Sequence, residues 1–284
     1  MKLISFVRDG RASFGVLDGE TVRDAGPILG PSHPDLRSVL GDAAALARLR
    51  AAAPQAPAVA RRDVTLLPPI PNPSKILCIG LNYEEHRVET GRPKTASPAV
   101  FTRFANTQIA HEDEIWVPAE SREIDYEGEL AVVIGRAGRR IARNKALEHV
   151  AGYACYNDVS VRDWQRHTTQ FTPGKNFPHT GSFGPWLVTA DEIADPQELS
   201  LTTRLNGQVM QQATTAQMIF QIADIIAYCS TFTRLEPGDV IATGTPGGVG
   251  FKREPQVFLQ PGDRVEVEIS SVATLRNRVI AEPV

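Results

Sequence analysis

Two glutamates separated by a single glycine stand at the start of an apolar run. Glu127-Gly128-Glu129 directly precedes Leu130–Ile134. Side chains two residues apart on a strand point to the same face, about 6.5–7 Å apart along the backbone, so these two acids should project together. Paired carboxylates repel each other unless a cation neutralises them. Oxygen-only ligands favour Mg²⁺ or Mn²⁺, with Ca²⁺ as an alternative. A solvated strand end with two ordinary acids is the competing interpretation.

A third acid closes a second apolar segment. Asp158 ends the run Gly152–Asp158, and acids are rarely buried unless they are paired or bind a metal. Three carboxylates leave several coordination positions for water and substrate, as is usual for Mg²⁺. The alternative is that Asp158 caps the segment 160–168 that follows it.

A histidine and a glutamate share one face of a predicted helix over residues 83–90. His86 and Glu89 are three residues apart, so they are neighbours on that helix. A carboxylate beside an imidazole holds the ring and raises its basicity, which suits a general base for water. An ordinary surface pair is the alternative interpretation.

Two loops carry weaker signals. Lys175 lies in a loop, where lysine is usually solvated, but within a site it would steer an acidic substrate or stabilise an oxyanion. The glycine-rich loop 243–250 lacks the spacing of a phosphate-binding or dinucleotide-binding motif. Its backbone N–H groups could hold a carboxylate, or the loop is simply a tight turn.

Composition limits the class of protein. The chain has 284 residues, 42% of them hydrophobic and 22% charged, with a net charge of −3. This balance argues against nucleic-acid binding. The three cysteines show no zinc or disulfide spacing, and no apolar run is long enough to span a membrane. We therefore expect a cytoplasmic protein without a nucleic-acid or membrane partner.

The pattern of elements changes near residue 70. Short strands are predicted within residues 1–24, a helix over 35–53, and an extended proline-rich linker up to residue 73. We therefore divide the chain into a small N-terminal α/β domain with its linker, 1–70, and a catalytic domain, 71–284. The second part shows many short strands and only a few helices, near 83–90, 144–150 and 216–231. Without regular βαβ alternation, this predicts a β-rich α+β fold, a sandwich or roll.

Five motifs occur together in order and resemble the fumarylacetoacetate hydrolase family. They are GLNYEEHRVE at 80–89, DYEGELAVVIG at 125–135, YNDVSVRD at 156–163, GKNF at 174–177 and PGDVIATGTPGGVG at 237–250. The resemblance implies a mixed β-sandwich roll and a homodimer. It also implies that Mg²⁺ or Mn²⁺ is bound by Glu127, Glu129 and Asp158.

The resemblance extends to catalytic and substrate-binding positions. It implies catalytic roles for His86, Glu89 and Lys175. The substrate contacts that it implies are Tyr83, Arg103, Arg162, Gln165 and Thr245. Two positions depart from the family pattern: Leu81 replaces a common arginine, and Arg103 replaces a common lysine. Arginine can clamp a carboxylate with two parallel hydrogen bonds, as lysine cannot.

The function implied is metal-dependent hydrolysis of a C–C bond in a 2,4-dioxo acid. The substrate would be of acylpyruvate or fumarylpyruvate type and would release pyruvate or a related 2-oxo acid, in aromatic or sugar-acid catabolism. The alternatives are isomerisation or decarboxylation of 2-hydroxyhepta-2,4-diene-1,7-dioate, and decarboxylation of oxaloacetate. A metal-binding protein without catalytic activity is the alternative from a different class.

Overall fold

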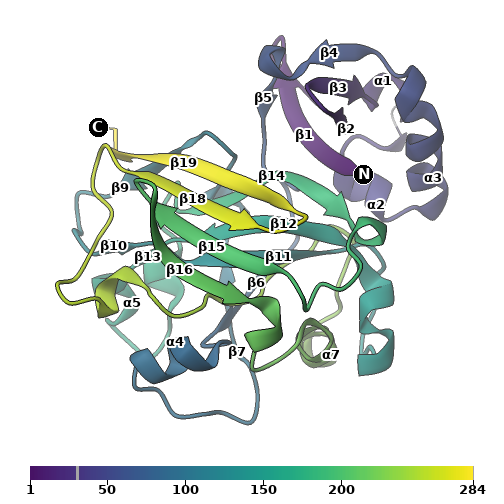
Figure 1. The fold of residues 1–284 in the computed structure, drawn as a ribbon. Coiled ribbons are helices and arrows are strands. Elements are labelled where there is room, and N and C mark those ends of the chain that lie inside the picture. The colour runs from purple at the N-terminus through teal and green to yellow at the C-terminus, as the bar shows by residue number, and fades with distance from the viewer. Residues whose placement is uncertain (30–31, 284) are drawn as a thin grey trace.

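The computed structural model describes residues 1–29 and 32–283 and is dominated by strands (Figure 1). Among these residues, twelve strands form the largest sheet: β1 (Lys2–Arg8), β2 (Arg11–Asp18), β3 (Thr21–Asp24), β4 (Ala58–Ala60), β5 (Thr65–Leu66), β6 (Ile76–Gly80), β7 (Ala99–Arg103), β8 (Gln108–Ile109), β11 (Gly128–Ile134), β12 (Val150–Asp158), β14 (Gly181–Thr189) and β17 (Val240–Ala242). Their order is β4-β3-β2-β1-β14-β12-β11-β17-β6-β7, with β5 paired to β1 and β8 paired to β14.

A second sheet lies against the first. It runs in the order β16-β15-β18-β19-β9 and contains β9 (Glu114–Val117), β15 (Ser200–Leu205), β16 (Gln208–Thr214), β18 (Arg264–Ile269) and β19 (Ala273–Ala281). A short separate pair joins β10 (Ile124–Asp125) to β13 (Ser160–Val161). The yellow and green strands of this second sheet cover the teal strands of the first in Figure 1.

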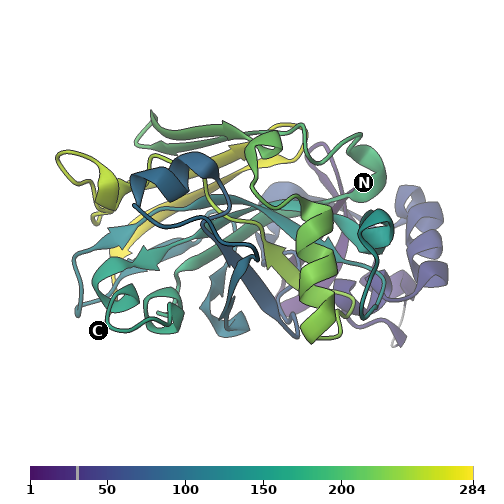
Figure 2. The same cartoon turned by 90° about the horizontal axis from the view of Figure 1, so that it is seen from below.

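The α-helices are short. They are α1 (Gly26–Leu29), α2 (Leu36–Leu40), α3 (Ala43–Ala52), α4 (Glu84–Glu89), α5 (Arg162–Gln165), α6 (Thr172–Lys175) and α7 (Ile222–Phe232). Viewed from below, α4 in blue and α7 in green lie in front of the strands (Figure 2).

Strand β11 is the centre of the core because both of its faces are covered. Leu130 and Val132 pack in a cluster with residues of the second sheet and α7. Ala131 and Val133, which point the other way, pack in a cluster with α2 and α3. A strand buried on both faces is apolar at every position rather than at alternate ones, which explains the uninterrupted run after Glu129.

The predicted β-rich α+β fold is confirmed, but two of the predicted elements are wrong in detail. The helix expected over 35–53 is divided at Gly41, and the Asp42 carboxylate restarts it as α3 by accepting the N–H of Ala44 at 2.8 Å. The proline-rich linker is not merely extended chain, since its strands β4 and β5 pair with β3 and β1.

Two later helices also differ from expectation. The segment expected as a helix over 144–150 is a 3₁₀-helix, Arg143–His149. The helix expected over 216–231 is a 3₁₀-turn, Thr215–Gln217, followed by α7. In both cases apolar spacing indicated a helical segment but not its type or its break.

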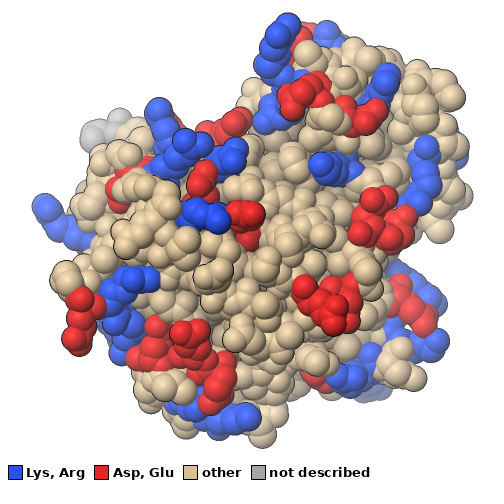
Figure 3. All heavy atoms as spheres, in the orientation of Figure 1, with Lys and Arg blue, Asp and Glu red and all other residues tan. Residues whose placement is uncertain are grey.

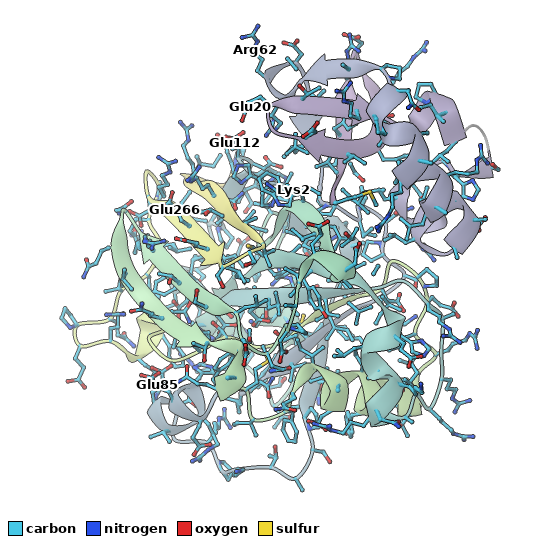
Figure 4. All side chains as sticks on the ribbon, turned by 45° about the vertical axis from the view of Figure 1, so that its right-hand side comes forward. Lys2, Glu20, Arg62, Glu85, Glu112 and Glu266 are labelled. Atoms are coloured by element: carbon cyan, nitrogen blue, oxygen red, sulfur yellow. The ribbon has the colours of Figure 1, made fainter. Side chains whose placement is uncertain are left out.

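The N-terminal segment is joined to the rest of the chain through the main sheet. Lys2 of β1 pairs with Val188 of β14, and its Nζ lies 4.7 Å from the centre of the Trp186 ring. Arg61 donates to Glu112 at 3.4 Å, and Figure 4 shows Glu112 beside this segment. Whether residues 1–70 fold as a separate domain stays a prediction.

Surface charge is mixed on the face that Figure 3 displays, where blue and red side chains alternate around a tan centre. Within the described chain, no helix is both long and apolar enough to cross a bilayer. The expectations of no nucleic-acid partner and of a cytoplasmic location stay predictions.

Gly128, between the two glutamates, faces the second sheet. A Cβ on Gly128 would lie 2.1 Å from Oγ1 of the fully buried Thr203. We expect Gly128→Ala to lower the free energy of unfolding by about 1–3 kcal/mol, as overpacking does. Denaturant unfolding measures this, with Gly80→Ala as the control, because a Cβ there meets its nearest atom at 3.5 Å.

The double variant Gly128→Ala/Thr203→Ala tests the cause. Thr203 Oγ1 has no hydrogen-bond partner among the described residues, so its removal leaves no other polar group unpaired. The two substitutions should compensate each other in a double-mutant cycle. Additive losses would show that the Gly128–Thr203 contact is not the cause.

Candidate active site

The register of two strands brings the three predicted metal ligands together. Glu127 and Glu129 flank the first residue of β11, and Asp158 is the last residue of β12. Gly128 pairs with Asn157, and the Asp158 N–H donates to the Glu127 carbonyl at 2.9 Å. The three carboxylates are buried, and their ligand atoms lie within 4.8 Å of one another.

Arg103, Arg162 and Lys175 neutralise most of the charge of this cluster. Lys175 Nζ donates to Glu127 Oε2 and to Asp158 Oδ2, both at 2.5 Å. Arg103 Nη1 donates to the other oxygen of Asp158, Oδ1, at 2.7 Å. Each carboxylate oxygen of Asp158 therefore already has a cationic partner.

Arg162 connects Glu127 to a fourth buried acid, Asp125. Arg162 Nη2 lies 2.8 Å from Asp125 Oδ2 and 2.7 Å from Glu127 Oε1. Asp125 also accepts the N–H groups of Gly250 and Phe251, at 2.8 and 3.1 Å. It was not singled out from the sequence, although an acid inside a buried motif was the available signal.

The four carboxylates and three cations, all buried, leave one negative charge without a buried lysine or arginine partner among the described residues. That charge belongs to Glu129, whose Oε2 accepts the Gly244 N–H at 2.8 Å. Burial, followed by repulsion from Asp158 and Glu127, raises the pKa of Glu129 well above its usual value. An isolated charge of this kind is costly in a protein interior.

The pKa of Glu127 is shifted in the opposite direction from that of Glu129. Burial acts to raise its pKa, but Arg162, Lys175 and His86 outweigh it and lower the pKa to about 2. Burial likewise acts to lower the pKa of Lys175, whereas the attraction of Asp158 and Glu127 raises it above its ordinary value.

A hard divalent cation fits this donor set. The ligands offer oxygen only, and the uncompensated charge at Glu129 is what a cation would balance. Glu127, Glu129 and Asp158 would hold it, and Lys175 would give up part of its contact with the two acids that it now bridges.

The predicted pair of His86 and Glu89, the dyad, is formed on α4, and His86 lines the cavity described below. His86 Nδ1 lies 2.7 Å from Glu89 Oε1, and Glu89 Oε2 accepts the Gly248 N–H at 2.9 Å. Because an ionised carboxylate only accepts hydrogen bonds, Nδ1 donates to Glu89, so in the neutral form of the imidazole the lone pair lies on Nε2. The dyad thus presents one basic nitrogen.

A cavity of about 520 Å³ connects these groups. His86, Glu127, Glu129 and Lys175 line its inner part. Its remaining wall is mixed in character, with aromatic and basic side chains: Phe101, Phe171, Phe251, Arg92, Arg166 and Lys252.

Three of the five predicted substrate contacts line this cavity. Arg162 and Gln165 lie together, with Nη1 of the arginine donating to Oε1 of the glutamine at 3.0 Å. Thr245 also lines it, and its hydroxyl donates to the Gly128 carbonyl at 3.0 Å. Leu81 gives the wall an apolar group.

Arg103 and Tyr83 are not brought to the cavity lining. Arg103 lies behind Asp158, where its other bonds go to the Val159 carbonyl at 3.0 Å and the Thr180 hydroxyl at 2.6 Å. Arg103 therefore orients Asp158, a predicted metal ligand, and does not contact a substrate in the cavity. Tyr83 is 1% exposed and packs in the core between the sheets. Motif matching located both residues in the sequence but could not show which way they point.

The chain belongs to the fumarylacetoacetate hydrolase family, since residues 75–280 match the family described as fumarylacetoacetate (FAA) hydrolase, C-terminal. Human oxaloacetate tautomerase FAHD2A, mitochondrial, is 44% identical over 242 residues, covering 84% of this chain and 77% of that protein. The similar relatives thus include oxaloacetate tautomerases, whereas an acylpyruvase was expected from the sequence.

Solved structures agree with the fold. Fumarylacetoacetate hydrolase from Exiguobacterium antarcticum superimposes with a TM-score of 0.86 at 36% identity, covering 99% of this chain and 100% of that one. Maleylpyruvate hydrolase from Sphingobium sp. SYK-6, in complex with manganese(II) and pyruvate, gives 0.85 at 29% identity with full coverage of both chains. The chain is thus an enzyme of this family, and its relatives carry out different reactions.

Replacing Glu129 by glutamine should have two opposite effects. Without metal and at neutral pH, Glu129→Gln should raise the melting temperature. Burial and repulsion from Asp158 and Glu127 raise the pKa of the parent carboxyl, so folding must either protonate it or bury its charge, and an amide needs neither. With Mn²⁺ the variant should lose most of the stabilisation of the parent, which amounts to ~2.7 kcal/mol at 100 times the dissociation constant. Thermal unfolding in EDTA and in Mn²⁺ measures both effects.

The exposed Glu148→Gln variant is the matched control and should behave as the parent does. Equal Mn²⁺ stabilisation of Glu129→Gln and parent would contradict the assignment of Glu129 as a ligand.

Proposed function

We propose that this protein interconverts the enol and keto forms of a short 2-oxo dicarboxylic acid such as oxaloacetate. One observation carries the proposal: His86, fixed by Glu89 through Nδ1, offers a single basic nitrogen to the cavity that Glu127 and Glu129 line. Tautomerisation needs one such group to exchange a proton with carbon. The 44% identity to oxaloacetate tautomerases supports the choice of substrate.

The proton balance is simple. From the keto form, His86 Nε2 takes a proton from C3, a C2–C3 double bond forms, the 2-oxygen gains a proton from solvent, and Nε2 then releases its proton to solvent. The reverse sequence regenerates the ketone. The three hydrogen bonds of the Lys175 ammonium go to Glu127 and Asp158, so it would stabilise the developing negative charge as a buried positive charge on the cavity wall. Mg²⁺ or Mn²⁺ bound by Glu127, Glu129 and Asp158 would supply Lewis-acid polarisation of the 2-oxo acid.

Basic residues support an acidic substrate. Arg92, Arg166 and Lys252 line the exposed part of the cavity, whereas the buried Arg162 is already paired with acids of the protein. Arg166 is partly neutralised, since its Nη2 donates to Glu123 at 2.6 Å. The cavity thus offers positive charge for more than one carboxylate, as a dicarboxylic acid requires.

The second candidate is hydrolysis of a 2,4-dioxo acid, with decarboxylation or dienedioate isomerisation as further alternatives. The same dyad supports it, because an oriented imidazole can also take a proton from water. The structural similarity to a maleylpyruvate hydrolase supports it. The two candidates differ in the atom that loses its proton, C3 or water oxygen.

Deuterium exchange separates these functions. In D₂O with Mn²⁺, the protein should accelerate two processes. One is the exchange of the C3 protons of oxaloacetate, measured by proton NMR, and the other is the loss of the enol form, measured by its ultraviolet absorbance. His86→Ala should lower both rates by about 10²–10⁴-fold, the usual contribution of a general base. His149→Ala, at a histidine bonded to the Arg136 carbonyl, is the control.

The same samples receive an acylpyruvate. Release of pyruvate that depends on His86, without acceleration of the C3 exchange of oxaloacetate, would contradict the tautomerase proposal and support the hydrolase. Oxaloacetate loss with carbon dioxide release would instead support decarboxylation.

A further inference from the structure

The backbone of Gly248 is held from both sides. Its N–H donates to Glu89 Oε2 at 2.9 Å. Its carbonyl accepts from the Tyr126 hydroxyl at 3.1 Å and from Arg253 Nε at 3.2 Å. Arg253 also donates from Nη2 to the Met210 carbonyl on β16, and from Nε to the Tyr126 hydroxyl at 3.2 Å. A continuous set of bonds therefore leads from the second sheet to the dyad.

Only glycine fits at this point of the chain. Gly248 has a φ of +95°, and a Cβ there would lie 2.3 Å from the Met210 carbonyl oxygen. The loop is thereby pressed against β16, which is what brings its N–H within reach of α4.

We infer that Tyr126 and Arg253 are positioning residues for the proton transfer at His86. They fix Gly248, Gly248 fixes one oxygen of Glu89, and the other oxygen holds His86 Nδ1. The kinetic part of this inference rests on the proposed role of His86 as the base. Neither side chain lines the cavity, so each acts through the dyad and not through the substrate.

Glu89 needs this second anchor. Its side chain is 21% exposed, whereas that of His86 is 7% exposed. A carboxylate at the end of a six-residue helix and open to water has other rotamers available, and each would release the imidazole. Anchoring both oxygens selects the rotamer that keeps the Nε2 lone pair toward the cavity.

Kinetics test the inference with two independent variants. Tyr126→Phe removes one donor and Arg253→Met removes the other. Each should lower kcat for C3 proton exchange by about 5- to 10-fold, the worth of one hydrogen bond, with KM within about twofold of the parent. The controls are Tyr153→Phe, at a buried tyrosine of β12, and Arg204→Met, at an arginine paired with Glu268.

Equal kcat in both variants and parent, or a loss carried by KM alone, would overturn the inference. Because Tyr126 adjoins Glu127, Mn²⁺ stabilisation is measured as well. If it falls in Tyr126→Phe while Arg253→Met retains full kcat, the effect arises at the metal ligands and the inference fails.

Histidine NMR tests the same chain of hydrogen bonds, from Tyr126 and Arg253 through Gly248 and Glu89 to His86, without any reaction. In protein labelled with ¹⁵N-histidine, the Nδ1–H signal of His86 is assigned by its loss in His86→Gln. Its exchange with water should be about 5- to 10-fold faster in Tyr126→Phe and Arg253→Met than in the two controls. An unchanged exchange rate in both variants would overturn the inference. Faster exchange in a protein inactive on oxaloacetate would overturn the proposed function alone.

Discussion

The burial of four acids in one place is the constraint on which the rest of the site depends. The acids lie at strand ends that are buried within the core: Asp125, Glu127, Glu129 and Asp158. Charges in such surroundings must be paired, and removal of one partner costs far more than the pair contributes. Arg103, Arg162 and Lys175 occupy fixed positions for this reason. Their orientation follows from the acids, and it leaves Glu129 as the place where positive charge is lacking.

The glycine-rich loop after β17 is the second organising feature. The N–H groups of Gly244, Gly248 and Gly250 donate to Glu129, Glu89 and Asp125. Successive backbone donors often form an anion site for a ligand. Here they hold the carboxylates of the protein itself, so one loop sets the relative positions of a predicted metal ligand, the dyad and the partner of Arg162.

The spacing of residues in the sequence predicted those parts of the site that depend on the geometry of a single strand or helix. Strand periodicity placed Glu127 and Glu129 on one face, and helix spacing placed His86 beside Glu89. The pairing of Asp158 with Arg103 could not be predicted in this way, since 55 positions separate the two residues and only the sheet order joins them. The break of the helix at Gly41 and the pairing of the proline-rich segment likewise depend on neighbours remote in sequence.

The acid cluster does not by itself select a reaction. In the proposed function, a base at His86 removes a proton from whatever lies between it and the three predicted metal ligands, either C3 of a substrate or a water molecule. Phe101, Phe171 and Phe251 line that space, and apolar walls disfavour a loosely held water. Because one fold serves different reactions, the proposed choice between C3 and water depends on what the cavity wall admits. In this chain the wall includes the apolar Leu81, where the family commonly has an arginine, and the proposed selection would depend on positions of this kind.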